Sequence, residues 1–139
     1  MSLHVEHVAG VLDVCGVFRV RMVQNTALPM VAAHSTDPVL LGYLSRVTGV
    51  GVTEVKRNYS RFGCDEHCAE KHIHVNHSSL RWSVTGARAG ILIYNVLPHL
   101  VLRHEQAEKV LDGTADAPFR KPTVQAMGRL GWQVPAGMK

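Results

Sequence analysis

Residues 7–18 read HVAGVLDVCGVF, and within this stretch the sequence changes from a pattern typical of a helix to one typical of a strand. A first helix is predicted over residues 3–13, with Ser2 as its cap, and a strand follows it closely. Gly10, in the middle of that helix, costs about 1 kcal/mol relative to alanine. Its presence therefore needs a reason. The usual one is close approach of another backbone, because Ala9 and Gly10 carry almost no side chain.

The rest of the chain predicts an α+β domain. Residues 18–22 alternate apolar and basic side chains, the two-residue period of a strand with one face in the core. Further strands are expected over residues 30–34, 52–61 and 80–84, with a turn over residues 25–29. A second helix is expected to start at Thr36 or Asp37 and end at Gly49, with others over residues 87–96 and 103–111. This order gives a four-stranded antiparallel sheet with helices on one face.

Composition limits the class of protein. The chain has 139 residues, of which 46% are hydrophobic, which is enough for one compact core. It has no apolar run of the roughly 18 residues that a membrane span requires, and no basic segment followed by an apolar run at the N-terminus. We expect a soluble, intracellular protein, cytoplasmic or nucleoid-associated, with no membrane partner.

The charges are unevenly distributed. The net charge is +4, and no Asp or Glu occurs between Val14 and Thr36 or between Lys71 and His104. The expected strands carry basic residues instead. Five of them are Arg19, Arg21, Lys56, Arg57 and Arg81. If their side chains share the outer face of the sheet, that face is positive and suits a nucleic acid.

A stretch rich in cysteine and histidine separates the third and fourth strands, at residues 62–78. Zn²⁺ takes four nitrogen or sulfur ligands in a tetrahedron, and thiolates bind it strongly. We favour Cys64, Cys68, His72 and His74 as ligands of a structural zinc, with His67 and His77 as possible substitutes. The alternative is a polar hairpin tip with free thiols.

Five fragments together resemble the LAGLIDADG homing endonucleases: VAGVLDVCG at 8–16, STD at 35–37, GVG at 49–51, RWSVTG at 81–86 and LPHLVLRHEQAEKVL at 97–111. The resemblance covers residues 3–112 and implies an αββαββα fold. It divides the chain into a LAGLIDADG-like DNA-binding domain at 1–113 and a basic tail at 114–139. The tail either docks as a short helix or frays.

A single signature implies a homodimer whose two signature helices pack side by side, with Ala9, Gly10 and Asp13 at the interface. In the family, the curved sheets lie along the major groove of double-stranded DNA, which suits the five basic strand residues. The second carboxylate of the signature binds the divalent cations, usually Mg²⁺, that support phosphodiester hydrolysis.

This sequence departs from the family at that carboxylate, where it has Cys15. Sulfur is a poor ligand for Mg²⁺. The polar position that helps to organise water in active relatives aligns with Ala33. Arg103 retains the basic residue after the proline, and Asp13 retains the first acidic position, which serves capping and the interface. Asp13, Cys15 and Arg103 therefore form a degenerate catalytic site.

These observations predict a double-stranded DNA-binding protein, derived from a homing endonuclease, that has lost cleavage and regulates a mobile element or phage. One alternative is an active endonuclease, which would need Mg²⁺ and a metal site rebuilt from other ligands. Another is a protein-interaction module that keeps the fold and no longer binds DNA.

Overall fold

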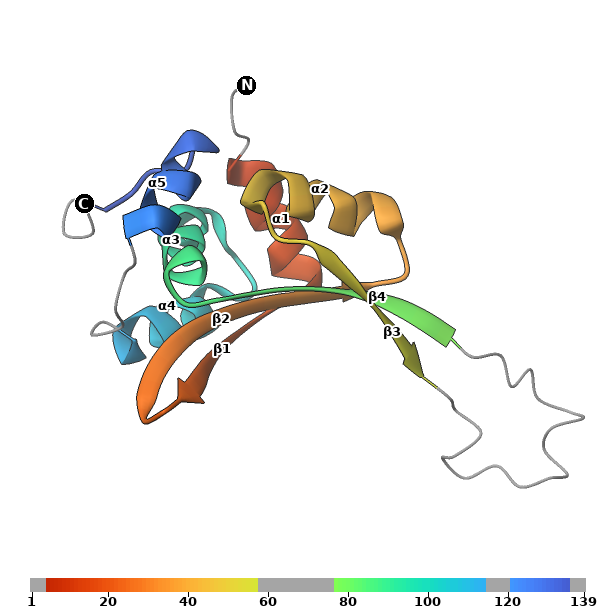
Figure 1. Ribbon diagram of the computed structural model, residues 1–139, viewed down its shortest axis with the longest axis horizontal. Helices are drawn as coiled ribbons and strands as arrows, with labels where there is room; N and C mark the ends of the chain where they lie inside the picture. Colours follow the sequence, from red (N-terminus) through yellow and green to blue (C-terminus); the bar gives the residue numbers. More distant parts are fainter. Residues whose placement is uncertain (1–4, 58–76, 115–120, 136–139) are drawn as a thin grey trace, which may run out of the picture.

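The computed structural model describes residues 5–57, 77–114 and 121–135. The elements follow the predicted order and confirm the α+β class (Figure 1). They are α1 (Val5–Cys15), β1 (Gly16–Val23), β2 (Thr26–Ser35), α2 (Pro38–Thr48), β3 (Val52–Arg57), β4 (His77–Thr85), α3 (Ala87–Val96), the 3₁₀ turn η3 (Leu97–His99), α4 (His104–Gly113) and α5 (Lys121–Arg129). Within the described residues, no helix is long and apolar enough to cross a membrane.

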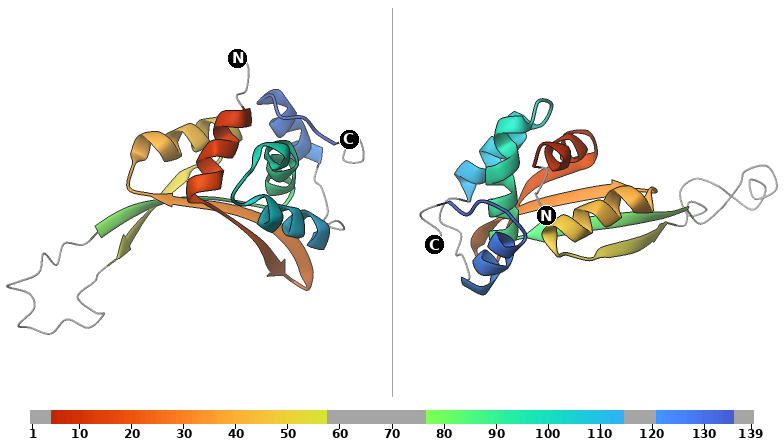
Figure 2. Two further views of the ribbon diagram at one scale, coloured as in Figure 1. Left: turned by 180° about the vertical axis from the view of Figure 1, so that it is seen from behind. Right: turned by 90° about the horizontal axis from the view of Figure 1, so that it is seen from above.

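The four strands form one antiparallel sheet in the order β1-β2-β4-β3. The left view of Figure 2 shows the helices on one side of this curved sheet. Phe18 pairs with Val31, and Val31 pairs with Val84, so these apolar side chains form a row beneath the helices. None of the described helices lies on the opposite side of the sheet. We call this side the strand face.

Trp82 anchors the core beneath α2. Its side chain is fully buried, as the alternation in the sequence predicts. The indole Nε1 donates to the hydroxyl of Thr48 at 3.1 Å, and that hydroxyl donates to the carbonyl of Leu44 at 2.7 Å. Both buried polar groups are therefore satisfied, which avoids the cost of an unpaired donor. The C-terminal turn of α2 is held against the sheet.

Helix α2 begins and ends at the residues that the sequence indicates. The Asp37 carboxylate accepts a hydrogen bond from Val39 N at 2.9 Å, and Pro38 occupies the first turn. Gly49 caps the other end in the left-handed conformation, with φ 73°, which glycine adopts without steric cost.

The turn between β1 and β2 is tighter than predicted, so the turn expected over residues 25–29 is wrong. Gln24 and Asn25 form it with φ of 49° and 66°, a two-residue hairpin turn. Pro29 stays inside β2, where its carbonyl accepts from Gly86 N at 2.9 Å. The Pro29 nitrogen points toward β4, as its carbonyl does, but the pairing of β2 with β4 starts only at Met30. No ladder hydrogen bond is therefore lost.

The segment after residue 120 docks on the core, which is one of the two outcomes considered for the tail. Met127 and Trp132 are buried. Trp132 Nε1 donates to the carbonyl of Val47 at 2.6 Å. Gln133 N donates to the Asn95 side-chain oxygen at 3.1 Å, and the Asn95 amide donates back to the Gln133 carbonyl at 2.9 Å. The segment is thus fastened to both α2 and α3.

Candidate nucleic-acid interface

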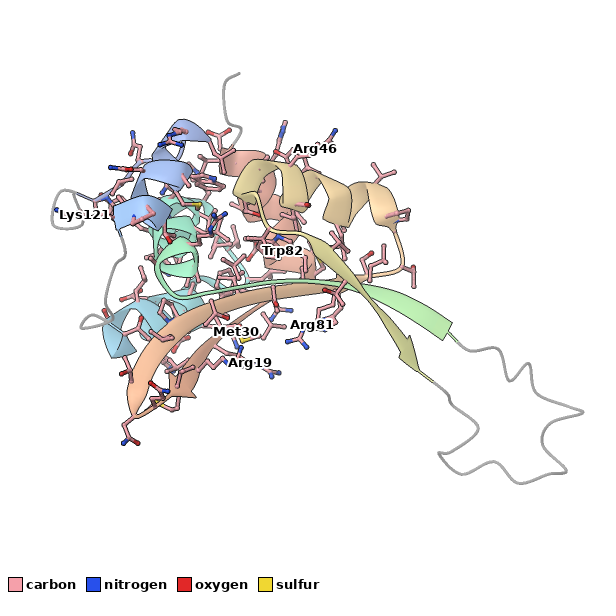
Figure 3. All side chains as sticks on the ribbon, in the orientation of Figure 1. Arg19, Met30, Arg46, Arg81, Trp82 and Lys121 are labelled. Atoms are coloured by element: carbon pink, nitrogen blue, oxygen red, sulfur yellow. The ribbon has the colours of Figure 1, made fainter. Side chains whose placement is uncertain are left out.

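Three of the five predicted basic residues are seen on the strand face. Arg19 and Arg21 are two residues apart on β1 and both are exposed. Arg81 lies on β4 and is partly buried. Figure 3 shows Arg19 and Arg81 on the open side of the sheet, whereas Arg46 and Lys121 lie among the helices on the other side. The chain therefore has cations on both sides.

The carboxylates, in contrast, are on one side only. Among the described side chains they lie on α1, before α2 and on α4: Glu6, Asp13, Asp37, Glu105, Glu108 and Asp112. Only the backbone of Glu54 is described, at a position of β3 that faces the helix side. Glu54 is assigned to the helix side because it pairs with Leu80, two residues from the Val52–Trp82 pair. Within the described ranges, the strand face is therefore cationic and has no acidic residue.

The backbone register separates Lys56 from Arg57. Arg57 pairs with His77, at a position on the same face as the Thr53–Arg81 pair. Lys56 pairs with Ser78, and neighbouring residues of a strand lie on opposite faces. Both residues are predicted from the sequence to face DNA, whereas the register places only Arg57 on the strand face. The structure does not describe either side chain.

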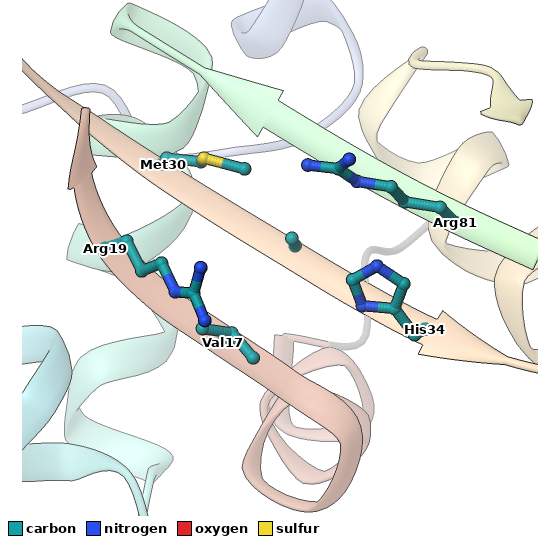
Figure 4. Close-up of a pocket in the computed structure, with 6 residues that line it drawn as sticks. Val17, Arg19, Met30, His34 and Arg81 are labelled. Atoms are coloured by element: carbon teal, nitrogen blue, oxygen red, sulfur yellow. The ribbon is translucent and has the colours of Figure 1, made fainter. Parts of the chain in front are cut away.

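A hollow of about 50 Å³ lies in the strand face (Figure 4). Its lining comes from β1, β2 and β4: Val17, Arg19, Met30, Ala32, His34 and Arg81. Figure 4 shows Arg19 and Arg81 reaching in from β1 and β4, with Met30 and His34 on the strand between them. Sequence reasoning missed Met30, Ala32 and His34, because their positions around the hollow depend on the register of all three strands.

The hydrogen bonding of Arg81 is incomplete. Its Nε is buried and has no hydrogen-bond partner. The other residues that line the hollow include no carboxylate that could accept from it. A buried N–H without a partner is uncommon and carries an energetic cost.

Asp13 and Cys15 of the predicted degenerate catalytic site lie at the C-terminal end of α1, and Arg103 lies just before α4. The Asp13 carboxylate accepts from Val101 N at 3.1 Å and from Arg103 N at 2.8 Å. Burial alone would raise the pKa of Asp13, but backbone N–H groups of Leu102, Arg103 and Val101, with the Arg103 charge, lower it overall. Asp13 therefore holds the segment before α4 in place.

Cys15 has no charge to offer a cation. Burial raises the pKa of its thiol, although a backbone hydrogen bond and the Arg103 charge act in the opposite direction. The S–H donates to the carbonyl of Val11 at 3.2 Å. The thiol is therefore neutral near pH 7.

The residues at this end of α1 do not fit Mg²⁺, a hard ion that needs oxygen ligands. Both oxygens of Asp13 are engaged by backbone N–H groups. Ala33, at the position that would organise water, is fully buried between Gly16 and Trp82 in the sheet. Elsewhere in the described part of the chain, no group of three or more His, Cys, Asp or Glu could hold a metal ion.

The outer surface of α1 differs from the predicted interface at one position. Ala9 is fully buried within the chain's own core, so it cannot face a partner. Gly10 is exposed, and a Cβ added there would meet no atom within 4 Å. Val14 is 76% exposed. Gly10 and Val14 border an apolar groove between α1 and α2, also lined by Val11 and Leu40.

The predicted zinc ligands Cys64, Cys68, His72 and His74 lie outside the described residues, as does the alternative His67. Only the backbone of His77 is described, at the start of β4. The zinc site therefore stays a prediction.

Comparison with known proteins gives a structural likeness without a sequence match. No family model matches the chain, and no curated protein matches it. Among solved structures, it is similar to the homing endonuclease I-CvuI, crystallised in complex with its target (Sro1.3) in the presence of 2 mM Ca. The TM-score is 0.55 at 17% identity, over 91% of this chain and 79% of that one. The chain therefore has a homing-endonuclease-like fold, as the LAGLIDADG resemblance predicts.

Proposed function

We propose that this chain binds double-stranded DNA as a homodimer, with its strand face in the major groove, and does not cleave it. The observation that carries this proposal is the strand face, with Arg19, Arg21 and Arg81 on it and no carboxylate among its described residues. The structurally similar I-CvuI was crystallised with its target, which supports the same class of partner for this fold.

The placement of charge favours one orientation on DNA. Phosphates attract the arginine side, and the carboxylates of α1 and α4 are repelled from the duplex. Arginine stays charged at every physiological pH. The protein should therefore meet the duplex with the strand face first.

The homodimer proposal depends on the outer surface of α1. A second copy is the occupant that we propose for the groove between α1 and α2, because Val14 is exposed and Gly10 leaves room for a close backbone. Two helices that meet at a glycine can approach closer than the usual 8–10 Å between axes. The pair of sheets would then extend the DNA contact over two half-sites.

Loss of cleavage follows from the chemistry at the end of α1. A homodimer would contribute two neutral Cys15 thiols and two Asp13 carboxylates already bonded to the backbone. The thiols bring neither negative charge nor oxygen ligands, and the Asp13 oxygens already accept backbone N–H groups, so this donor set suits Mg²⁺ poorly. A DNA-binding domain without cleavage suits a regulator of a mobile element or phage.

The zinc site completes the proposal. Residues 62–78 contain few apolar side chains, so a structural zinc on Cys64, Cys68, His72 and His74 would supply folding free energy that a small core cannot.

Three measurements test the proposed function. Duplex binding by fluorescence anisotropy, repeated across salt concentrations, should give a steep decrease of log K with log [salt]. A flat slope would favour a protein-interaction module. Supercoiled plasmid incubated with Mg²⁺ or Mn²⁺ should stay uncut, and metal-dependent double-strand breaks would establish the endonuclease alternative. Light scattering should give twice the mass of one chain.

A further inference from the structure

The hollow in the strand face combines an apolar floor with a cationic rim. Ala32 lies at its centre, since it pairs with Val17 on one side and Ser83 on the other. Met30 and His34 flank Ala32 on the same face of β2. Arg19 pairs with Met30, and Arg81 pairs with His34. The two arginines therefore lie diagonally across Ala32.

The unpaired Nε of Arg81 favours movement of its guanidinium toward a bound ligand. In the free chain its Nε is buried without a partner, so movement of the guanidinium toward an acceptor in a ligand relieves an unsatisfied donor. Arg19 is already exposed. Both groups carry only donors, so the ligand they suit presents acceptors.

The edges of DNA bases differ in what they present to such groups. In the major groove, guanine offers two acceptors, N7 and O6, which suit a bidentate arginine, whereas cytosine and adenine present amino donors. Thymine adds a 5-methyl group, which apolar side chains recognise. The hollow measures about 50 Å³, more than the roughly 10–15 Å³ that a cavity needs in order to hold one water. It therefore has room for a methyl group.

We propose that this hollow is a base-reading site, an inference that depends on the proposed DNA-binding function. Arg81 and Arg19 donate to N7 and O6 of guanines, and the 5-methyl group of an adjacent pyrimidine sits over Ala32. The preferred half-site therefore contains guanine next to a pyrimidine with a 5-methyl group. Thymine and 5-methylcytosine both present that group, and the experiment separates them.

The first experiment selects bound sequences from a pool of random duplexes. The wild-type protein should enrich guanine beside thymine. Arg81→Ala should lose the preference for one guanine, a change of about 5- to 150-fold in relative affinity at that position. Arg46→Ala, which removes an equal charge from the helix side, should keep the wild-type preferences. A selected site without guanine, or one that Arg81→Ala leaves unchanged, would overturn the inference.

The second experiment changes the DNA and leaves the protein intact. In the selected duplex, 7-deazaguanine removes the N7 acceptor, and deoxyuridine removes the methyl group from thymine. The deoxyuridine duplex should bind about fourfold more weakly, the value expected for one buried carbon group. Cytosine should bind more weakly than 5-methylcytosine at the same position, and equal binding of the two would refute the methyl site.

The variant Ala32→Val fills the hollow with a residue that strands tolerate. It should bind the thymine and deoxyuridine duplexes equally, whereas Thr85→Val, on the same face outside the hollow, should still distinguish them. If no duplex binds the wild-type protein at any salt concentration, the proposed function fails. If duplexes bind with full affinity but without these base effects, only this inference fails.

Discussion

Replacing Arg19 and Arg21 together with alanine should weaken DNA binding without unfolding the protein. Both side chains are exposed on β1, and substitutions at such positions usually change the free energy of unfolding by less than about 0.5 kcal/mol. The matched control replaces Arg46 and Lys121 with alanine. These are also exposed, but they lie on the helix side (Figure 3). Both double variants lose two positive charges, so they differ only in where the charge is lost.

The size of the effect depends on what the arginines contact. If both contact phosphates, the slope of log K against log [salt] should become shallower by about 1.8 per protomer and about 3.6 per homodimer, at about 0.9 for each contact. If both contact base edges, each loss should cost about 1–3 kcal/mol of binding free energy, with a smaller change in slope. The control should change the slope by much less than either.

Fluorescence anisotropy of a labelled duplex at several salt concentrations measures both quantities, and thermal unfolding of each variant checks the fold. Equal effects of the two double variants would mean that only net charge matters, and that the strand face is not the binding surface. Unchanged affinity and slope in the Arg19/Arg21 variant would refute the reasoning outright.

Three further predictions concern the metal sites and Asp13. Cys15→Asp should create divalent-cation binding at the dimer centre, measurable by calorimetry and absent in the wild type, while cleavage stays absent because Ala33 leaves the surrounding shell incomplete. Protein purified without added zinc should contain about one Zn²⁺ per chain, and Cys64→Ser should lower both zinc content and Tm; full stability after chelation would contradict this. The lowered pKa of Asp13 stabilises the fold above the ordinary carboxyl pKa of about 3.9 and loses that effect as pH falls through the lowered value. Asp13→Asn should therefore be less stable at pH 7, by about 1–2 kcal/mol, and should lose less stability on acidification in urea titrations.

Local patterns predict much of the fold. The helix α3 has the predicted bounds, and the Asp37 and Gly49 caps of α2 are found as expected, because these features depend on residues within a few positions of each other. The turn before β2 was placed too late, because Pro29 is usually a sign of a turn. It is tolerated here only because β4 does not yet pair at that residue, which is tertiary information.

Part of the candidate site can also be predicted from local patterns. Alternation within each strand is enough to find Arg19 and Arg21 on β1 and Arg81 on β4. The hollow around Ala32 requires the relative register of three strands, one of which is some fifty residues away in the chain, and sequence spacing does not encode that register. The bonds from Asp13 to the backbone before α4 likewise join residues 88 and 90 positions apart.

The hydrogen bonds of Trp132 and Gln133 have a consequence for how the protein can be shortened. A boundary after residue 113 looks natural in the sequence, but a chain cut there would lose Met127 and Trp132 from the core. It would also leave the Val47 carbonyl without its indole donor and Asn95 without its partner. Residues 121–135 therefore complete the core and hold α2 and α3 in place. An expression fragment intended for DNA-binding work should extend at least through residue 133.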